Sequence, residues 1–368
     1  MNRAEAWYTV DSEQEIDSPA LLIFPDRIRH NIQLATAMIG DVKRLRPHVK
    51  THKSKHITQL QQEAGIQKFK CATITEAQML ADCGAEDVLL AYPVQGPKVA
   101  RLLRLIQQYP QTRFSTLIDA VSSAQEIARM ASESNLSVDV FVDLDLGMGR
   151  TGIVPGDEAL ALYRFAVSAE GLNCRGFHGY DGHVRDLELE KRKIRCEQSF
   201  KSVLKMTEVL QAEGIAKPEL VMGGSPTFPV YVDYPEVECS PGTFVLWDKG
   251  YTDLLPEQHF LPAAVLLARV VSIPAENHLC LDLGYKAVAS ENALENRFFF
   301  LNATGIIAVG QSEEHLVVRH QAEDIYAIGA IFYALPVHVC PTVALYDELY
   351  VVNDGRLTAT WQVDARGR

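Results

Sequence analysis

The chain has 368 residues, of which 47% are hydrophobic and 22% are charged, and its formal net charge is −12. This length exceeds one ordinary core, so we expect either one large barrel or two domains. The acidic balance argues against a nucleic-acid partner, because neutralising phosphates requires Lys and Arg gathered on one face. The most basic stretch, EKRKIRCEQ at 190–198, is interleaved with acids and predicts a solvated helix face.

No segment of the sequence predicts a membrane partner or export. The N-terminal MNRAEAWYTVDSEQEID lacks the apolar run of a signal peptide. The two most apolar stretches, 261–275 and 326–340, are shorter than a bilayer span and are interrupted by Pro or Arg. Seven scattered cysteines without a CxxC pair suit a reducing compartment. We therefore expect a cytoplasmic protein.

From about residue 19 to residue 235 the chain alternates short apolar runs with amphipathic helical stretches. The runs are ALLIF, KFKCAT, DVLLAY, RFSTLI, VDVFVDLD, CRGFHGY and PELVMGG. The helical stretches between them are 26–40, 75–85, 97–109, 120–134 and 186–213. This number of β–α units favours a closed (β/α)8 TIM-type barrel over a doubly wound sheet. No GxGxxG motif follows the first run, which further weakens the doubly wound alternative.

After about residue 240 the pattern becomes β-rich. AAVLLARVVSIP, HLCLDLG, HLVVRH, DELYVVND and LTATWQV are separated by Gly, Pro, Asn and Asp, which is typical of strands joined by turns. We therefore predict a barrel domain over residues 15–240. Residues 1–14 and 241–368 are predicted to form a β-rich C-terminal domain.

The segment RLRPHVKTHKS (44–54) places basic side chains at alternate positions. If 45–52 is a barrel strand, then Arg46, His48, Lys50 and His52 share the inner face, near the C-terminal mouth where barrel active sites form. A lysine among cationic neighbours and away from water has a lowered pKa, as Schiff-base chemistry requires. Lys53 falls on the opposite face, so Lys50 is the better candidate. An exposed basic loop is the alternative interpretation.

Two glycine turns follow the last predicted barrel strands. MGGSPTF (222–228) and SPGTF (240–244) each combine backbone N–H groups with hydroxyls, which can bind a phosphate. Each turn alone is weak evidence, because such turns are common. Together with an inward lysine, and at the place where barrels bind phosphate, they point to pyridoxal phosphate.

His338 and Cys340 lie two apart in the β-like run LPVHVC, so we expect both side chains to project from one face. Imidazole and thiolate together favour zinc, although two protein ligands leave the coordination open. Taken alone, this pattern is more commonly explained by a buried cysteine beside a hydrogen-bonded histidine.

The chain resembles the fold-type III pyridoxal-phosphate enzymes, whose N-terminal domain is an alanine-racemase-like barrel. Within them it is similar to the D-serine dehydratase and D-threonine aldolase group. The resemblance covers nearly the whole chain. It rests on SPALLIFPDRIRHNI, RPHVKTHK, DLGMGRTG, GYDGH, MGGSPTF, SPGTFV, LDLGYKA and LPVHVCPTVALYD.

The resemblance implies a role for several residues. Lys50 would form the internal aldimine, Arg150 would contact the substituents of the cofactor ring, and Tyr180 would lie against that ring. The phosphate would be held by Ser225, Thr227, Gly242 and Thr243. The family pattern has one more residue in the first phosphate turn (GGSTPT-like) than the GGSPT of this chain. The identity of the hydroxyl that meets the phosphate is therefore undecided between neighbouring positions of this turn.

In enzymes of this family a divalent metal held by the His-x-Cys dyad meets the β-hydroxyl and carboxylate region of the substrate. The resemblance thus implies His338 and Cys340 as metal ligands, with zinc the expected ion and manganese or magnesium the alternatives. It implies a homodimer with a small D-amino acid as substrate. Asp282 and Lys286 are further candidates to line the site, with a surface position as the alternative for Lys286.

The expected reaction is β-elimination of water from a D-3-hydroxy amino acid, giving a keto acid and ammonia. Cys340 fits the dehydratase branch, which gives elimination a slight preference over retro-aldol cleavage. An amino-acid racemase and a non-catalytic pyridoxal-phosphate carrier are the remaining hypotheses, and the dyad and the C-terminal domain count against them. Lys50 is the expected base at Cα. The candidates for a second base are His183, which we prefer, and His178, His48 and His52.

Overall fold

The computed structural model describes residues 6–368, and the chain divides into two units. The barrel unit comprises Ala35–Lys50, Thr58–Gly242 and Gly367–Arg368. The β-rich unit comprises Met1–Leu34, Thr51–Ile57 and Thr243–Arg366. The division at 242/243 lies two residues from the predicted boundary at 240/241, but residues 15–34 and 51–57, which the sequence pattern assigns to the barrel, fall in the β-rich unit.

The barrel unit contains a seven-stranded, all-parallel sheet in sequential order. Its strands are β2 (Lys68–Cys71), β3 (Asp87–Pro93), β4 (Arg113–Ile118), β5 (Val138–Leu144), β6 (Leu172–Gly179), β7 (Glu219–Met222) and β8 (Val237–Cys239). The residues of β5 are almost all buried, as expected for a parallel strand covered on both faces. The predicted runs from KFKCAT to PELVMGG are confirmed as strands of this sheet.

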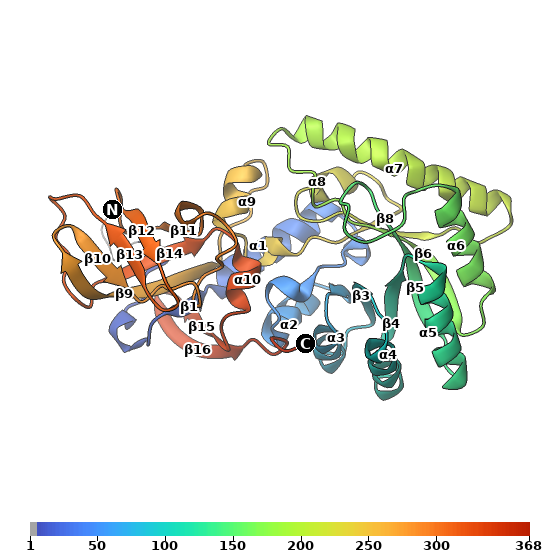
Figure 1. Cartoon of the computed structure of the whole chain (residues 1–368), viewed down its shortest axis with the longest axis horizontal. Helices are drawn as coiled ribbons and strands as arrows, with labels where there is room; N and C mark the ends of the chain where they lie inside the picture. Colours follow the sequence, from blue (N-terminus) through green and yellow to red (C-terminus); the bar gives the residue numbers. More distant parts are fainter. Residues whose placement is uncertain (1–5) are drawn as a thin grey trace. The chain divides into compact units, whose positions relative to one another are not determined.

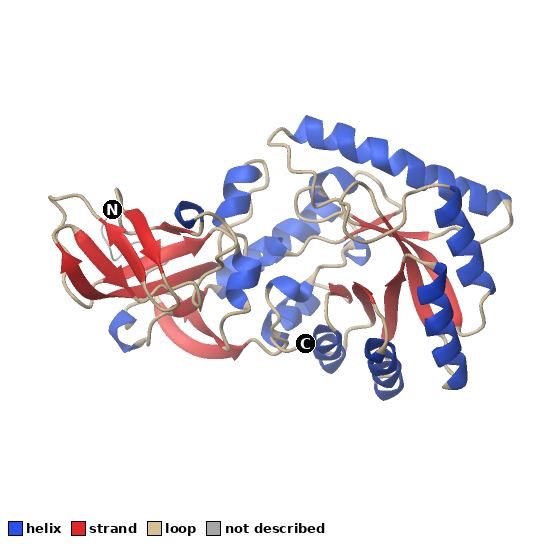
Figure 2. Ribbon diagram, in the orientation of Figure 1, coloured by secondary structure: helices blue, strands red, loops and turns tan. Residues whose placement is uncertain are grey.

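Helices follow the strands, as a (β/α) fold requires, and α3–α6 lie along the outer face of the strands (Figures 1 and 2). They are α3 (Ile74–Asp82), α4 (Pro97–Gln108), α5 (Val121–Glu133), α6 (Asp157–Ser168), α7 (Leu189–Ala212) and the short α8 (Phe228–Tyr231). Two further helices, α1 (Pro25–Ile39) and α2 (Lys55–Glu63), begin in one unit and continue in the other.

The two outer strands of this sheet are joined by residues 45–48. Leu45 forms a parallel bridge with Cys239 of β8, and His48 forms one with Lys70 of β2. The segment therefore takes the place of a first barrel strand, but only for four residues. The predicted strand over 45–52 is wrong beyond His48, because Val49–Thr51 forms a 3-10 turn, η4.

The run ALLIF is not a barrel strand. Its residues form β1 (Ala20–Ile23), which pairs with β9 and β15 of the β-rich unit. All four residues of β1 are buried because strands flank it on both sides. A buried parallel strand and a buried central strand of another sheet are equally apolar, so the run alone could not assign its sheet.

Ion pairs fill the barrel interior at the N-terminal ends of the strands. Arg46 pairs with Asp87 of β3 at 2.6 Å and with Glu238 of β8 at 2.7 Å. Arg175 of β6 pairs with Asp87 at 2.7 Å and with Glu219 of β7 at 2.7 Å. Residues of non-adjacent strands meet in this way only across a barrel, so the seven-stranded sheet curls around a filled interior.

An apolar layer lies above these ion pairs, and a polar layer lies above the apolar one. Leu89, two residues after Asp87 on β3, belongs to a buried cluster with Leu117, Phe141 and Val221. Two residues after Phe141 on β5 comes Asp143, which pairs with His178 of β6. The two-residue period of the strands thus stacks a charged, an apolar and a second polar layer toward the C-terminal mouth.

The β-rich unit is built on a nine-stranded, mostly antiparallel sheet. Seven strands follow the order β12-β13-β10-β9-β1-β15-β16, while β14 pairs with β9 and β11 pairs with β14. Its strands besides β1 are β9 (Ala264–Ala275), β10 (His278–Leu281), β11 (Phe298–Phe300), β12 (Ile307–Gln311), β13 (Leu316–Arg319), β14 (Ile331–Pro336), β15 (Glu348–Asn353) and β16 (Arg356–Gln362). The β-rich unit also contains the helices α9 (Lys249–Leu254) and α10 (Val339–Val343). Its 3-10 turns are η2 (Glu13–Glu15), η5 (Thr243–Val245) and η6 (Leu294–Asn296), whereas η3 (Val42–Arg44) lies in the barrel unit. The five predicted C-terminal strands are confirmed.

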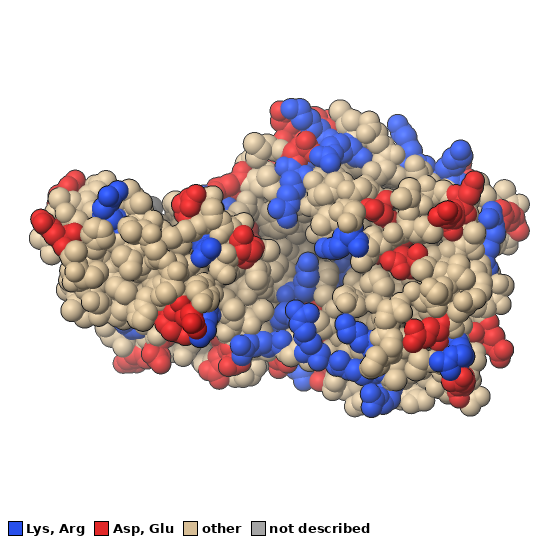
Figure 3. Space-filling view, viewed as in Figure 1, with Lys and Arg blue, Asp and Glu red and all other residues tan. Residues whose placement is uncertain are grey.

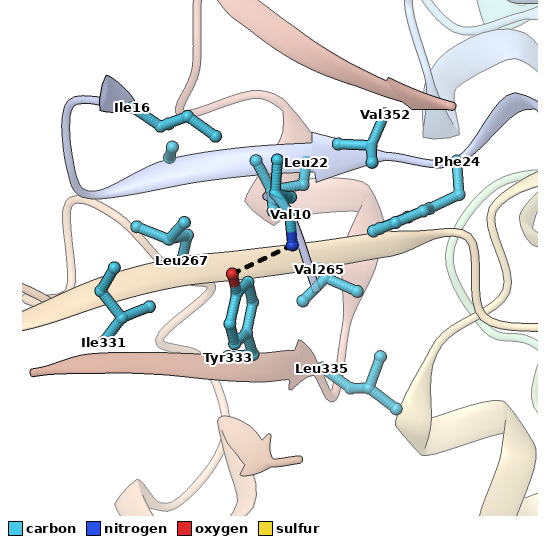
Figure 4. Close-up of a cluster of buried hydrophobic side chains, with 11 residues drawn as sticks. Val10, Ile16, Leu22, Phe24, Val265, Leu267, Ile331, Tyr333, Leu335 and Val352 are labelled. Atoms are coloured by element: carbon cyan, nitrogen blue, oxygen red, sulfur yellow. Dashed lines mark hydrogen bonds between the residues drawn. The ribbon is translucent and has the colours of Figure 1, made fainter. Parts of the chain in front are cut away.

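The core of this unit is formed by β1, β9, β14 and the N-terminal segment (Figure 4). Leu22, Leu267 and Tyr333 are each fully buried in it. The phenol of Tyr333 accepts a hydrogen bond from the backbone N–H of Val10 at 3.4 Å and donates one to Glu13 at 2.7 Å. A buried side chain thereby ties the N-terminal segment to the sheet.

Replacing Tyr333 with phenylalanine is expected to lower the free energy of unfolding by about 1–3 kcal/mol, because the Val10 N–H would stay buried without its acceptor. Urea unfolding of the variant and of wild type gives this difference directly. Tyr285→Phe, at an exposed tyrosine, is the matched control and should change stability by less than about 0.5 kcal/mol. Equal stability of Tyr333→Phe and wild type would contradict the assignment.

The basic stretch 190–198 lies in α7, where Lys191, Lys193 and Arg195 pair with Glu188, Glu190 and Asp186 on exposed positions. The predicted solvated helix face is therefore confirmed, except that Arg192 is fully buried. On the face that Figure 3 shows, uncharged side chains cover most of the unit that carries β9–β16. Among residues 6–368, no helix is long and apolar enough to cross a membrane.

Candidate active site

Lys50 occupies the centre of η4 and is exposed, and its backbone N–H donates to Nδ1 of His48 at 3.2 Å. The prediction that four basic residues share one inner face is wrong. Arg46 lies in the ion-paired layer, whereas His52 follows the turn and belongs to the β-rich unit. The reason is that a 3-10 turn has three residues per turn, which ends the two-residue alternation after His48.

His52 is fully buried, and burial lowers its pKa to about 3, with a hydrogen bond from Ser54 opposing the shift. Its Nδ1 accepts that hydrogen bond at 3.2 Å. A neutral imidazole in this position is built into the β-rich unit. Its full burial argues against His52 as the second base.

A second lysine, which no motif in the sequence indicates, lies inside the barrel. Lys70 of β2 is 2% exposed, and its Nζ lies 3.4 Å from Nε2 of His178. Nδ1 of His178 pairs with Asp143 at 2.7 Å, and Thr151 donates to the same carboxylate at 3.0 Å. Burial, and then the charge of Lys50, lower the pKa of Lys70 to about 7. The lowered lysine pKa expected from cationic neighbours is therefore found at Lys70.

Tyr180 follows β6 directly, two residues after His178. Its ring centroid lies 5.8 Å from Nζ of Lys70 and 5.3 Å from Cζ of Arg150, so two cationic side chains approach it. The ring also lies close to Gly224, where an added Cβ would come within 2.8 Å of Cε2. Glycine at 224 is thus needed for the turn 222–228 to pack against Tyr180. The fold therefore places Tyr180 and Arg150, which the resemblance assigns to the cofactor ring, next to each other.

His183 lies beside the loop DLGMGRTG. Gly147 adopts φ +111°, and a Cβ there would come within 2.9 Å of Nε2 of His183. The carboxylate of Asp145 accepts the N–H groups of Gly147 and Gly149, and these bonds lower its pKa. Nδ1 of His183 is buried without a hydrogen-bond partner among residues 6–368. The loop is therefore shaped around an imidazole that has free hydrogen-bonding capacity.

The two glycine turns of the barrel unit are joined by a hydrogen bond. The N–H of Gly242 donates to the hydroxyl of Ser225 at 3.3 Å. The hydroxyl of Ser240 is buried and has no partner among the described residues. A buried hydroxyl without a partner, next to two glycine turns, fits a phosphate, which accepts several hydrogen bonds. We therefore find that this part of the barrel unit fits pyridoxal phosphate.

Thr227 is placed differently from the other predicted phosphate residues. Its hydroxyl donates to the buried carboxylate of Asp181 at 2.6 Å and accepts from the N–H of Gly224 at 3.2 Å. Burial raises the pKa of Asp181. The Thr227 hydroxyl thus fixes the turn from within. Thr243, which follows Gly242 in the chain, lies in η5 of the β-rich unit.

His338 and Cys340 lie in the β-rich unit at the start of α10. The β-like run ends at Pro336, and His338 is the N-cap of α10, so the prediction that both residues lie in one strand is wrong. Their side chains nevertheless meet. Burial alone would lower the pKa of His338, but the hydrogen bond to Cys340, its charge and Glu291 outweigh burial and raise the pKa to about 9.

Three neighbours hold this dyad. Glu291 bonds to Nδ1 of His338, which leaves Nε2 as the nitrogen that could meet a metal. The hydroxyl of Thr51 lies 3.1 Å from the Cys340 sulfur. Asp248 accepts the N–H of Val339 at 3.0 Å and fixes the turn. A carboxylate at Nδ1 is an outer contact that metal-binding histidines commonly use, and the arrangement of His338 and Glu291 has this form.

The dyad therefore fits a divalent metal with open coordination positions. Within the described chain, no group of three or more His, Cys, Asp and Glu side chains is arranged to hold a metal ion. Asp282 accepts the backbone N–H of Arg269 at 2.6 Å. Lys286 is exposed and pairs with Glu313 at 2.6 Å and with Glu314 at 3.3 Å, so the surface interpretation holds for this residue.

Comparison with known families decides the classification. Residues 23–247, more than half of the chain, match the model "Alanine racemase, N-terminal domain". The chain belongs to the alanine racemase N-terminal domain family. Residues 263–352 match a second model, "Putative serine dehydratase domain". A family barrel is thus followed by a β-rich domain of the dehydratase type, as the resemblance implied.

Several named proteins are similar to this chain over nearly its whole length. A D-threonine aldolase from Arthrobacter sp is 29% identical over 97% of this chain and 94% of its own. A D-threo-3-hydroxyaspartate dehydratase from Delftia sp. (strain HT23) is 24% identical over 96% of this chain and 98% of its own. The crystal structure of a D-threonine aldolase from Filomicrobium marinum has a TM-score of 0.86, with 24% identity and 95% coverage of both chains.

Proposed function

We propose that this protein is a pyridoxal-phosphate- and divalent-metal-dependent lyase that acts on D-3-hydroxy amino acids. The observation that carries the proposal is that one chain contains both residues suited to pyridoxal phosphate and a His–Cys pair suited to a metal. The barrel unit has a lysine and phosphate-type turns, and the β-rich unit has the supported His338–Cys340 dyad. Full-length similarity to named aldolases and dehydratases supports the same reaction class.

Pyridoxal phosphate, when bound, supplies an aldehyde for the substrate amine and a ring that accepts the electron pair left at Cα. Lys50 would hold the cofactor covalently through Nζ, and Tyr180 and Arg150 would lie at the ring and its substituents. Ser225, Ser240, Gly242 and Thr243 would bind the phosphate, while Thr227 shapes the turn. The Nζ of Lys50 would also be the base that takes the proton from Cα of the substrate.

His338 and Cys340 would hold the metal, which supplies Lewis acidity toward a hydroxyl oxygen at Cβ when bound. His183 would hold or give a proton at Nε2, the nitrogen beside Gly147. Loss of the α-proton and of the β-hydroxyl as water leaves an enamine, which hydrolyses to a keto acid and ammonia. Elimination is our first assignment because the second ligand of the dyad, Cys340, is a thiolate rather than a carboxylate or another oxygen ligand.

Retro-aldol cleavage is the second candidate. It is favoured by the similarity to the Arthrobacter D-threonine aldolase, which is more similar to this chain than the Delftia dehydratase is. In this reaction His183 would take the proton of the β-hydroxyl, and the Cα–Cβ bond would break to give glycine and an aldehyde. A racemase does not need the His338–Cys340 dyad, so the dyad and its contacts count against racemisation.

Product analysis tests the proposal. The purified enzyme is incubated with D-serine, D-threonine and D-threo-3-hydroxyaspartate, each with and without EDTA. Ammonia and a keto acid, both lost on chelation, would support elimination; glycine and an aldehyde, lost in the same way, would support the second candidate. Appearance of the L-isomer, unaffected by EDTA, would contradict a lyase and indicate a racemase.

Thr51→Val is expected to weaken metal binding about 10–100-fold, because the Cys340 sulfur loses the hydroxyl that lies 3.1 Å away. Competition with a chromophoric chelator measures the affinity without reference to turnover. Thr51→Ser keeps the hydroxyl and should bind metal as wild type does. Wild-type affinity in Thr51→Val would show that this hydroxyl does not support a metal ligand.

Three finer assignments belong to the same proposal. Zinc is the expected metal, since imidazole and thiolate are ligands that it prefers, with manganese or magnesium as the alternatives. A cytoplasmic location agrees with seven free cysteines, several of them buried. A homodimer follows from the family resemblance, and size-exclusion chromatography with light scattering tests it.

A further inference from the structure

Lys70 is a buried cation to which the proposed chemistry gives no role. It lies in the polar layer of the barrel, and its backbone is fixed by the bridge to His48 and by the hydrogen bond from its N–H to Pro47. Its side chain is 2% exposed. An ammonium removed from water loses hydration, which costs free energy unless partners compensate. The barrel thus holds a lysine that needs an explanation other than stability.

The groups that face Lys70 come from several elements. His178 lies on β6 and Asp143 on β5, while Asp181 follows β6. Arg46, from the segment 45–48 that joins β8 to β2, and Lys50, in the turn η4 that follows it, add positive charge. Burial and Lys50 lower the pKa of Lys70 to about 7, Asp143 and Asp181 oppose this, and Arg46 adds to it.

This arrangement defines the state of His178. Burial, and then the charge of Lys70, lower the pKa of His178, whereas Asp143 opposes the shift. The imidazole is therefore neutral, and its Nδ1–H donates to Asp143 at 2.7 Å. The other nitrogen, Nε2, is left as an acceptor and faces Nζ of Lys70 at 3.4 Å. Lys70 is a donor that suits this tautomer.

Lys70 also approaches Tyr180, the residue that the proposed function places at the cofactor ring. Its Nζ lies 5.8 Å from the ring centroid, within the range of cation–π attraction. Gly224 leaves room for the same ring at the phosphate turn. One lysine therefore contacts both a fixed imidazole below the mouth of the barrel and an aromatic ring at the mouth.

We infer that Lys70, held in place by His178 and Asp143, is a positioning residue for the cofactor and acts directly on the ring of Tyr180. The inference rests on the proposed function, because the proposed function is what places Tyr180 at the cofactor ring. Lys70 makes no bond to substrate. It holds the orientation of the aromatic ring on which the cofactor would bind, and it keeps His178 in a single tautomer.

The test compares Lys70→Met with Lys68→Met. Lys68 lies two residues earlier on the same strand, is partly exposed, and pairs with Glu238 outside the polar layer. Apoprotein is titrated with pyridoxal phosphate at pH 6, and affinity and the absorption maximum of the bound cofactor are recorded. Lys70→Met should bind about 3–30-fold more weakly and shift the maximum, while Lys68→Met should match wild type. The melting temperature of each apoprotein is measured in parallel.

Unchanged affinity and an unchanged absorption maximum in Lys70→Met would overturn the inference, as would weaker binding that only accompanies a lowered melting temperature. A measurement on wild-type apoprotein needs no variant: ¹⁵N NMR of labelled histidines should show His178 neutral with the proton on Nδ1. A charged His178, or the opposite tautomer, would contradict the network. Failure of wild type to bind pyridoxal phosphate would refute the proposed function itself, whereas the NMR result would still test the network.

Discussion

Lys50→Ala is expected to lower kcat/KM by roughly 10⁴-fold, the scale of loss seen when a central catalytic group is removed. The variant has neither the amine that would hold the cofactor covalently nor the base that would take the α-proton. Neighbouring residues do not replace it, because Lys70 is buried and bonded to His178. Initial rates of ammonia or aldehyde release measure the loss. The visible absorption of the purified protein should change at the same time, since the cofactor is no longer bound through a lysine.

Lys53→Asn is the control for this experiment. Lys53 is three residues from Lys50 and adopts φ +53°, a conformation that asparagine tolerates better than most residues do. The control should keep the cofactor and most of the activity. If Lys53→Asn lost the cofactor and Lys50→Ala kept it, the assignment of the covalent lysine would be reversed.

The barrel could be predicted from sequence because its strands and helices have distinct periods. Runs such as VDVFVDLD and RFSTLI are buried on both faces, and amphipathic stretches follow them. The order of strands then follows from the preference for adjacent parallel units. The identity of the first barrel strand could not be predicted in this way. ALLIF has a stronger strand pattern than RLRPH, yet its partners lie in another sheet.

Candidate site residues could be named from the sequence where a motif itself carries the chemistry. Lys50, Ser225, Gly242 and the dyad His338–Cys340 stand in segments whose residue types suggest a function, and the structure places the two halves of the dyad in contact. Lys70 was missed because KFKC is an ordinary strand pattern. Only the register that pairs His48 with Lys70 shows that this side chain enters the barrel.

Lys70→Met is expected to stabilise the protein at acidic pH, because it removes a cation that the folded barrel disfavours. The pKa of Lys70 falls from 10.5 in the unfolded chain to about 7 in the folded one. The destabilisation is therefore close to its full value at pH 6, where it is on the order of 5 kcal/mol, and it is relieved as the pH rises from 7 to 10.5. The advantage of Lys70→Met should accordingly shrink to about half by pH 9. Urea unfolding at pH 6, 7, 8 and 9 measures it.

Lys68→Met is again the control, because the side chain of Lys68 is partly exposed, and its difference from wild type should vary little with pH. Asp143 keeps its bonds from His178 and Thr151 in the Lys70 variant, so no buried carboxylate is left without partners. A variant that is less stable than wild type at every pH would mean that Lys70 serves the fold. If Lys70→Met is instead more stable than wild type but binds the cofactor more weakly, then Lys70 destabilises the fold and supports cofactor binding. Such a residue is kept for the group that it positions and not for stability.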